Sequence, residues 1–539
     1  MLSFLEAALY QFTRLTSIPV HRAVKGNQPM TRRSRVILTG STPCAAARTR
    51  SIRETRRGGC IAAKSVKLLL WLPLALFAPT TAIAAEALDP TFGAGGITRL
   101  HDGYSGNPVL RTLGVGKDGY YVVGSGRGLD EPFPYGYHLW VRRILRDGSV
   151  DVAFGDKGLF VWKSPLPQKT VMPAGIVVDE RGGIFIAGSV YYGERERANP
   201  FIIKLTRTGT LDRTFGTDGV VRFGFGEFQF SDVDALGIDA AARLYVAGQA
   251  RPDALPQNAR AVVMRFLSDG RSDLGYGQQG TAVLPRVSAL DPSGSRLASW
   301  VAAKASPDHR ADLWSSKGVQ GLAVSKQGEV VAVGTITSNK HYYCSVARLY
   351  SNGQPERGFG QGGVLLIAPI PRQDSPCYAV SAWVNGTIVV GGKTSPQDAS
   401  ASHGDRAAVF GVTSSGQLDR SFGVGGVFHP IADRASSVRA VVQTRQGELF
   451  VSGWTAAPKL PHMDAFIFKS GATGKPDVNW PSKPAAIPGL MTIDLPIDGT
   501  SSNDDAIGLA LDGESVAVGI TTLRRNLGFP PSVARIHVR

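Results

Sequence analysis

The sequence predicts an all-β fold: a seven-bladed β-propeller with four antiparallel strands in each blade. Three observations lead to this prediction. A motif with the pattern Leu-Asp-x-x-Phe-Gly recurs along the chain, and four β-rich segments separated by turns fill each period. In addition, the two ends of the repeat region supply complementary parts of one blade.

The recurring motif, which we call the signature, is clearest at Leu211-Asp-Arg-Thr-Phe-Gly and most worn at Pro476-Asp-Val-Asn-Trp-Pro. Its copies lie 58–63 residues apart, with one longer step of 83. We interpret the aromatic as an anchor between blades and the following Gly as a residue that permits positive φ in a tight turn. Trp480-Pro481 departs from this pattern, so we expect a different loop there. The aromatic positions are Phe92, Phe154, Phe215, Tyr276, Phe359, Phe422 and Trp480.

One repeat, residues 172–223, illustrates the strand pattern. Its second segment is apolar without alternation, as expected of a strand that is buried on both faces. Turn residues separate the segments, and no helical spacing is present. The four expected strands are Ala174–Asp179, Ile184–Ser189, Phe201–Thr206 and Gly219–Phe223.

The ends of the repeat region predict a closed ring. The region begins with a lone fourth strand at 95–100 and ends with three strands of a unit, so we expect the N-terminal strand to complete the seventh blade. Closure also removes the open ends that a linear stack would have to cap. The predicted domain is 86–539, with blades near 108–163, 172–224, 233–285, 318–368, 377–429, 438–495, and 504–539 plus 95–100.

A basic and an acidic residue recur eight positions apart in most blades. Because a residue pair repeated in every blade serves the blade, we interpret these pairs as ion pairs that tie each third strand to its loop, rather than as a charged ring for a ligand. In the fifth blade Gly411 stands opposite Asp419 and leaves the acid without this partner. The pairs are Arg143 with Asp151, Lys204 with Asp212, Arg265 with Asp273, Arg348 with Glu356, and Lys469 with Asp477.

The Leu-Asp-x-x-Phe-Gly-x-x-Gly motif resembles that of the delta-60 repeat family, over residues 88 to about 480, and the strand order is similar to that of NHL propellers. The resemblance implies a propeller and an exported bacterial protein. It implies no activity.

The leader also predicts export. Lys64 and Lys67 precede the apolar run 68–78 and small residues up to Ala84, which together are typical of a signal peptide at 61–85. The apolar run is too short for a membrane anchor, so we expect no membrane span in the mature chain. We assign no fold to residues 1–60. A start near Val66 is our interpretation, with a long disordered extension as the alternative.

Charge and cysteines limit the partners and the compartment. The net charge of +16 comes mainly from the leader, since residues 86–539 hold 46 Lys and Arg against 41 Asp and Glu, a net of +5. We therefore expect no nucleic-acid partner. After processing only Cys344 and Cys377 remain, and a disulfide between them stays an open question because the sequence does not give their Cα separation.

No motif in the sequence predicts catalysis. Gly114-Val-Gly-Lys-Asp-Gly and Val390-Gly-Gly-Lys-Thr resemble nucleotide-binding loops but lie between expected strands, where a dinucleotide or phosphate site would need a following helix. We predict no catalytic residue, no cofactor and no metal ligand from the spacing of residues.

Loops therefore offer the better prediction of a site. In blades of this kind, the connections between second and third strands and those between blades emerge on the same face. We expect this face, including the insertion 285–318, to bind a protein, peptide or glycan, in a chain that acts as a monomeric, non-catalytic scaffold. The alternative is an extracellular hydrolase or lyase with a site at the central channel mouth. The candidate binding residues are Arg296, Trp300, His309, Arg310, Trp314, Tyr135, Tyr137, Tyr191, Tyr192, Tyr342, Tyr343 and Trp454.

Overall fold

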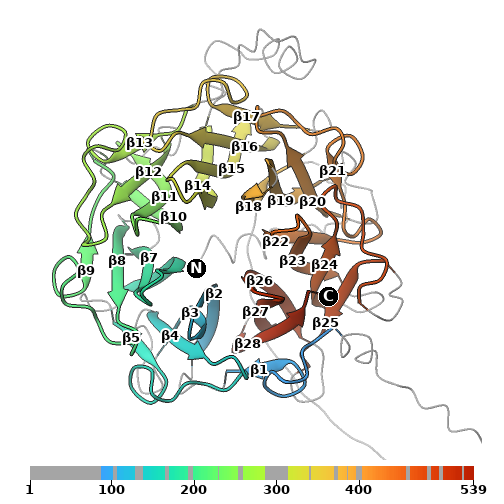
Figure 1. Ribbon diagram of the computed structural model, residues 1–539, viewed down its shortest axis with the longest axis horizontal. Coiled ribbons are helices and arrows are strands. Elements are labelled where there is room, and N and C mark those ends of the chain that lie inside the picture. The colour runs from blue at the N-terminus through green and yellow to red at the C-terminus, as the bar shows by residue number, and fades with distance from the viewer. Residues whose placement is uncertain are drawn as a thin grey trace, which may run out of the picture. The chain divides into compact units, whose positions relative to one another are not determined.

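The computed structural model confirms the seven-bladed β-propeller: seven four-stranded antiparallel sheets lie in a ring (Figure 1). No helix long and apolar enough to cross a membrane occurs in the described part of the chain. The structure describes residues 87–100, 106–127, 137–163, 169–191, 198–226, 228, 230–252, 259–285, 313–338, 341–368, 374–384, 386–395, 404–456, 462–481, 487–496, 502–524 and 527–538.

The blades are numbered along the chain, and in each blade the strands follow one another from the inner edge outward. Blade 1 holds β2 (Gly106–Gly116), β3 (Gly119–Arg127), β4 (His138–Ile144) and β5 (Phe160–Trp162). Blade 2 holds β6 (Thr170–Val178), β7 (Ile184–Tyr191), β8 (Asn199–Leu205) and β9 (Val220–Arg222). Blade 3 holds β10 (Phe230–Ile238), β11 (Leu244–Arg251), β12 (Arg260–Phe266) and β13 (Thr281–Val283). Blade 4 holds β14 (Leu313–Val324), β15 (Val330–Ser338), β16 (His341–Leu349) and β17 (Val364–Ile367).

Blade 5 holds β18 (Cys377–Val384), β19 (Thr387–Thr394), β20 (Arg406–Val412) and β21 (Val427–Phe428). Blade 6 holds β22 (Ser436–Gln443), β23 (Leu449–Ala456), β24 (Met463–Ser470) and β25 (Leu490–Ile493). Blade 7 joins β26 (Asn503–Asp512), β27 (Ser515–Arg524) and β28 (Leu527–His537) to β1 (Ile97–Arg99). The fourth blade begins at Leu313, five residues earlier than the sequence pattern predicts.

The ring closes as predicted, because the N-terminal strand β1 pairs with the C-terminal strand β28. Ile97 lies opposite Ala534 in this antiparallel pair. The inner strands β26 and β2 are also in contact, as are the inner strands of every other pair of neighbouring blades. In Figure 1 the blue strand β1 accordingly lies beside the red strand β28.

The core lies between the sheets. Each second strand is buried on both faces, which explains its unbroken apolar sequence: from Ile184 to Val190 every residue of β7 is buried. The buried residues form seven clusters, and most of these clusters combine side chains of two neighbouring blades. Stability of the ring therefore depends on contacts between blades as much as on pairing within them.

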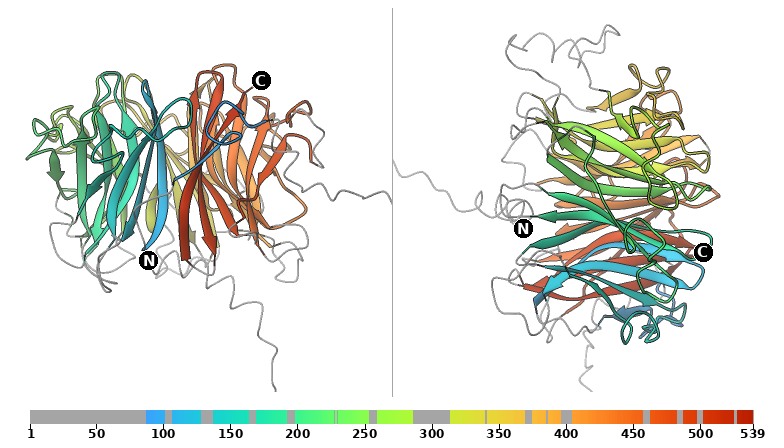
Figure 2. Two further views of the ribbon diagram at one scale, coloured as in Figure 1. Left: turned by 90° about the horizontal axis from the view of Figure 1, so that it is seen from below. Right: turned by 90° about the vertical axis from the view of Figure 1, so that its left-hand side faces the viewer.

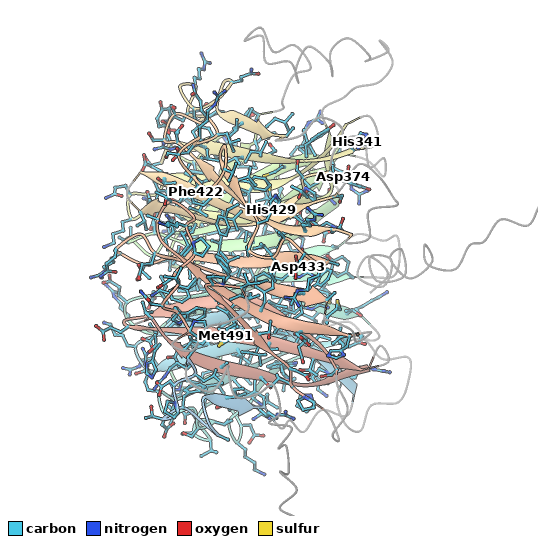
Figure 3. All side chains as sticks on the ribbon, turned by 90° about the vertical axis from the view of Figure 1, so that its right-hand side faces the viewer. His341, Asp374, Phe422, His429, Asp433 and Met491 are labelled. Carbon is cyan, nitrogen blue, oxygen red and sulfur yellow. A yellow bond between two sulfur atoms is a disulfide. The ribbon has the colours of Figure 1, made fainter. Side chains whose placement is uncertain are left out.

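The connections divide the ring into two faces (Figure 2). Because the strands are antiparallel, the connections from first to second and from third to fourth strand lie on one face, which we call the signature face. The connections from second to third strand and from blade to blade lie on the other, the variable face. Figure 3 shows this separation: His341 and Asp374 lie toward one side, and Phe422 of a signature lies toward the other.

The signature Gly forms a hydrogen bond to the neighbouring blade, which we call the clasp. Its backbone N–H donates to a carbonyl in the turn that follows the third strand of the next blade. Gly155 N, for example, lies 2.8 Å from Thr208 O. The Gly that follows this carbonyl leaves no room for a side chain, since a Cβ on Gly209 would lie 2.7 Å from Gly155 N. The six clasps join Gly93 to Asp147, Gly155 to Thr208, Gly216 to Asp269, Gly277 to Asn352, Gly360 to Ser415 and Gly423 to Thr473.

The signature of blade 6 forms no clasp, because Pro481 has no N–H to donate. The Trp480–Pro481 bond is cis, and the indole Nε1 of Trp480 lies 3.4 Å from His537 O in blade 7. Gly489 N donates to Trp480 O, as Gly219 N donates to Phe215 O in blade 2. The loop between donor and acceptor is longer in blade 6 than in the other signatures. The loop thus differs as the sequence predicts.

The recurring ion pairs form, and they reach the next blade as well. Arg143 Nε donates to Asp151 at 2.6 Å within blade 1, while its Nη1 donates to Arg207 O of blade 2 at 2.7 Å. Arg348 likewise binds Glu356 and donates to Ser414 O. The other predicted pairs are in contact too: Lys204 with Asp212, Arg265 with Asp273, and Lys469 with Asp477.

Candidate functional site

Six of the twelve predicted binding residues, and the side chain of a seventh, lie outside the part of the chain that the structure describes. The backbone of Trp314 belongs to strand β14, but its side chain is not among the described parts of the chain. The residues that lie outside the described part of the chain are Tyr135, Tyr192, Arg296, Trp300, His309 and Arg310.

The remaining five predicted residues do not form one patch. Tyr343 is only 1% exposed and packs in the core of blades 3 and 4, which is a correction to its expected place on the rim. Its neighbour Tyr342 is 46% exposed, since successive residues of a strand point to opposite faces. Tyr137, Tyr191 and Trp454 are half-buried at the variable-face ends of their strands.

The structure instead draws attention to the inner strands, each of which carries a β-bulge at the same position. The strand pairing shifts by one residue there, so in every blade the inner strand holds one extra residue that has no counterpart in the register of the second strand. Bulges re-aim side chains and are common beside functional sites. We call these seven residues the inner ring: Arg111, Ala174, Asp234, Gln320, Tyr378, Arg439 and Ile507.

The inner ring varies in chemistry from blade to blade, unlike the clasp. It contains two arginines, an aspartate, a glutamine and a tyrosine, and all seven side chains keep part of their surface accessible to solvent. Two positions further along each strand the residue is aliphatic, as in Leu236 and Leu322. The inner edge of the blades is therefore polar toward the variable face and apolar toward the signature face.

One set of contacts links blades 1 to 3, in which Arg111 Nη2 of blade 1 donates to Met172 Sδ of blade 2 at 3.5 Å. Arg111 Nε donates to Ser125 Oγ at 3.3 Å, and burial lowers the pKa of its guanidinium to about 10. Tyr191 of blade 2 donates its hydroxyl to Asp232 of blade 3. Burial raises the pKa of Tyr191 well above its ordinary value, and the charge of Asp232 raises it further. Burial also raises the pKa of Asp232.

A second network links blades 5 to 7. Arg439 Nε donates to Asp505 at 2.8 Å, and although burial opposes the charge, Asp505 keeps the pKa of Arg439 raised. Lys393 binds Asp405, and Tyr378 lies beside both. Arg439 of the inner ring is thus paired with an acid of the next blade, and Lys393 with an acid of its own blade. Such an arrangement can offer several hydrogen-bond donors and acceptors to a ligand.

A separate cluster lies at the variable-face end of blade 6. His462, Asp464 and Asp494 bring one ligand atom each to within 4.8 Å of one another. Burial raises the pKa of Asp464, and His462 opposes this rise. Asp504 of blade 7 lies nearby, and burial raises its pKa to about 7.

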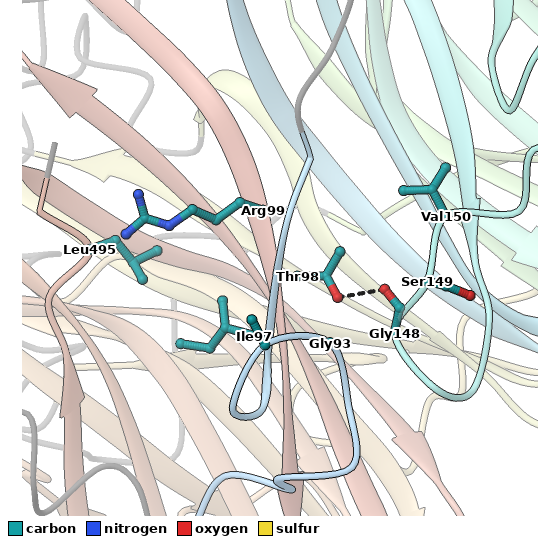
Figure 4. Close-up of a pocket in the computed structure, with 9 residues that line it drawn as sticks. Gly93, Ile97, Thr98, Arg99, Gly148, Ser149, Val150 and Leu495 are labelled. Carbon is teal, nitrogen blue, oxygen red and sulfur yellow. Dashed lines mark hydrogen bonds between the residues drawn. The ribbon is translucent and has the colours of Figure 1, made fainter. Parts of the chain in front are cut away.

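A depression open to solvent lies at the outer edge, beside the closing strand β1 (Figure 4). Thr98 Oγ1 donates to Gly148 O at 2.6 Å across its floor, and Arg99 and Leu495 lie on its other side. Arg99 is the one charged side chain among its lining residues. The depression is therefore a consequence of ring closure and brings together no reactive groups.

The structure also contains a disulfide that the sequence left open. Cys344 of β16 and Cys377 of β18 are bonded, with Cα atoms 5.0 Å apart. The bond links blade 4 to blade 5. Cys344 lies inside its strand, and Cys377 is the first residue of its own.

Sequence reasoning missed one ion pair. Arg535 Nε donates to Asp89 at 2.7 Å, although the two residues are 446 positions apart. Asp89 holds the acid position of the first signature and Arg535 holds the cation position of the last third strand. The signal was present in the sequence. The first acid and the last cation of the recurring pairs remain without partners along the chain, and ring closure brings them into one blade.

No family model matches the chain, and none of the curated proteins compared with it is similar. Among solved structures, the sialidase of Trypanosoma rangeli in complex with sialic acid is 10% identical with a TM-score of 0.39, over 84% of this chain and 59% of that chain. Sqt1 from Chaetomium thermophilum is 10% identical with a TM-score of 0.36, over 81% of this chain and 100% of that chain. The present chain thus spans 59% of the length of the sialidase, and these weak likenesses say nothing of activity.

Proposed function

We propose that this protein is an exported, non-catalytic binding scaffold that takes a protein, peptide or glycan partner on its variable face. One observation carries the proposal: chemical variation between blades is concentrated at the inner ring, toward the variable face, whereas the signature face repeats one structural contact. Residues that differ between otherwise equivalent blades are free to serve a ligand, since loops and strand ends on a rigid scaffold commonly carry function.

The pairing of charges favours binding over the alternative, a hydrolase or lyase. A general acid or base must have access to the proton that it transfers. Arg439 with Asp505, and Lys393 with Asp405, are instead held in salt bridges. Charges fixed in this way suit the orientation of a polar ligand.

Export is supported by the signal-like segment 61–85 and by the buried disulfide, because disulfides persist in oxidising compartments. The resemblance to delta-60 repeats points the same way. N-terminal sequencing of the protein from the periplasm and the medium would test this part of the proposal, and an unprocessed chain that stays in the cytoplasm would contradict it.

Binding can be tested on glycan arrays and on displayed peptide libraries with three variants of the protein. In the first, a short Gly-Ser linker replaces residues 286–312, and in the second Gln320→Ala removes one polar group of the inner ring. The control is Val424→Ser, at a side chain of the signature face that is 89% exposed. We expect a ligand of the native protein to bind the first two variants at least tenfold more weakly and the control equally well. Absence of any ligand, or a loss confined to Val424→Ser, would contradict the proposal.

A further inference from the structure

The cluster at the variable-face end of blade 6 arises from strand geometry. His462 and Asp464 are two positions apart and so lie on the same face of the sheet. Ala465 pairs with Ile493, which places Asp464 opposite Asp494 on the neighbouring strand. Like charges that lie directly opposite each other on paired strands are destabilising. A positive charge close to both carboxylates would relieve this repulsion.

Two carboxylate oxygens of this cluster are buried. Oδ1 of Asp494 has no hydrogen-bond donor among the described residues, and Oδ1 of Asp464 has a close polar contact only within the cluster itself. Asp464 is only 9% exposed. The close polar contact of its Oδ1 is His462 Nε2 at 3.2 Å, an atom that is itself a metal ligand when the imidazole is neutral. Arg434 acts on Asp464 through its charge, which offsets part of the repulsion.

Blade 7 fixes both segments that carry these side chains. Met463 N, between His462 and Asp464, donates to Asn503 Oδ1 at 3.0 Å. Leu495 N, next to Asp494, donates to Asp504 Oδ2 at 2.8 Å. Such outer contacts hold ligands in place and are a regular feature of metal sites.

We propose that His462, Asp464 and Asp494 bind one divalent transition-metal cation of the zinc type. One imidazole nitrogen and two carboxylates suit Zn²⁺ or Mn²⁺, whereas Ca²⁺ and Mg²⁺ prefer oxygen ligands alone. The three ligand atoms are within 4.8 Å of one another, so one ion can reach them all with small side-chain adjustments. Three protein ligands leave a coordination position for water or for a group of a partner.

The position of this site gives the ion a structural role. The three ligands belong to blade 6 and their segments are held by blade 7, so the ion would fix the blade 6 side of the junction between these two blades. At this same junction Pro481 prevents the clasp on the signature face. Metal binding therefore supports the junction that lacks the contact present at six others.

The full chain, purified without a histidine tag and stripped with EDTA, allows a direct test. Calorimetric titration with ZnCl₂, MnCl₂, CaCl₂ and MgCl₂ gives stoichiometry and affinity, and thermal melting gives the stabilisation. Asp494→Asn removes one ligand charge at nearly constant volume, and His462→Gln is a second variant at a half-buried position. Asp433→Asn is the control, because this nearby carboxylate is 65% exposed and outside the cluster.

We expect the wild type and Asp433→Asn to bind one Zn²⁺ and to melt at a higher temperature with it. Asp494→Asn and His462→Gln should bind at least tenfold more weakly, with no rise in melting temperature. Anomalous diffraction at the zinc edge from crystals of the wild type should show a peak between the three side chains. This measurement does not depend on whether the variants fold. No binding by the wild type, equal binding by the ligand variants, or a peak elsewhere would overturn the proposal. Preference for Ca²⁺ over Zn²⁺ and Mn²⁺ would overturn the assigned metal class.

Discussion

Replacement of Gly416 by alanine tests whether the clasp stabilises the ring. Gly416 has φ +75°, and its turn supplies the carbonyl of Ser415 that accepts the clasp of Gly360. A Cβ at this position would lie 2.3 Å from Gly360 N and 2.9 Å from Cγ of Phe359. Both obstacles are fixed, one by the backbone and the other by the buried signature ring, so the blades must separate to admit the methyl group.

Gly425 provides the matched control. It has φ +64°, and a Cβ there would meet nothing within 4 Å. Both alanines carry the strain of the left-handed conformation, about 1–2 kcal/mol each. Gly416→Ala should in addition lose a hydrogen bond worth about 1 kcal/mol and force an overpacked contact that costs about 1–3 kcal/mol. The expected difference between the two variants is therefore about 2–4 kcal/mol.

Urea unfolding followed by circular dichroism and tryptophan fluorescence measures this difference, provided that the two signals change together. The comparison requires that the free energy of unfolding depend on urea concentration with the same slope in the wild type and in both variants. If the two alanine variants differ by less than about 0.5 kcal/mol, the scatter usual for surface substitutions, the clasp makes no measurable contribution and our reasoning is wrong.

Two further predictions concern the charged and covalent links. The hydrogen bond from Lys204, and after it those from Thr214, lower the pKa of Asp212. The stability from this carboxylate is therefore present above the unfolded pKa of about 3.9 and is lost as the pH falls through the lowered folded value. Asp212→Asn should be less stable than the wild type at pH 7, with a gap that closes in acid, whereas Asp419→Asn, opposite a glycine, should show a smaller gap. Thermal melts from acid to neutral pH check this, and equal gaps would contradict it. For the disulfide, which closes a sequence separation of 33 residues, replacement of both Cys344 and Cys377 by Ser should cost roughly 3–4 kcal/mol. Reductant should lower the melting temperature of the wild type toward that of the double variant, and no change with reductant would show that the bond contributes nothing.

The sequence predicts the fold well because each blade repeats the same local signals. Turn glycines and unbroken apolar second strands specify four strands per period, and the split blade at the two termini predicts closure. Pairs within one blade, such as Arg143 and Asp151, follow from a constant spacing. The pair of Arg535 and Asp89 does not, because only ring closure brings the two residues together.

The candidate site was harder to predict for a physical reason. A bulge is a shift of pairing between two strands, which leaves no mark in the sequence of either strand alone. The residues at the bulges also share no side-chain chemistry, as Arg111 and Ala174 show. Metal-ligand spacing also failed as a signal. His462 and Asp464 are two positions apart at the start of β24, but Asp494 joins them only through the pairing of β24 with β25.

The worn signature of blade 6 has a structural explanation that links these observations. In six junctions the signature Gly donates to a turn that follows the third strand of the next blade. Blade 7 has no such turn among its described residues, because its third strand β28 and the signature at Leu88 belong to opposite ends of the propeller segment. In the described part of blade 7 no turn carbonyl therefore takes the place of the clasp acceptor, and on the side of blade 6 Pro481 offers no N–H donor. Trp480 reaches His537 O instead, and on the variable face the segments of His462 and Asp494 are tied to blade 7. The departure from the repeat thus falls at the junction where the described residues supply neither the donor nor the acceptor of the repeated contact.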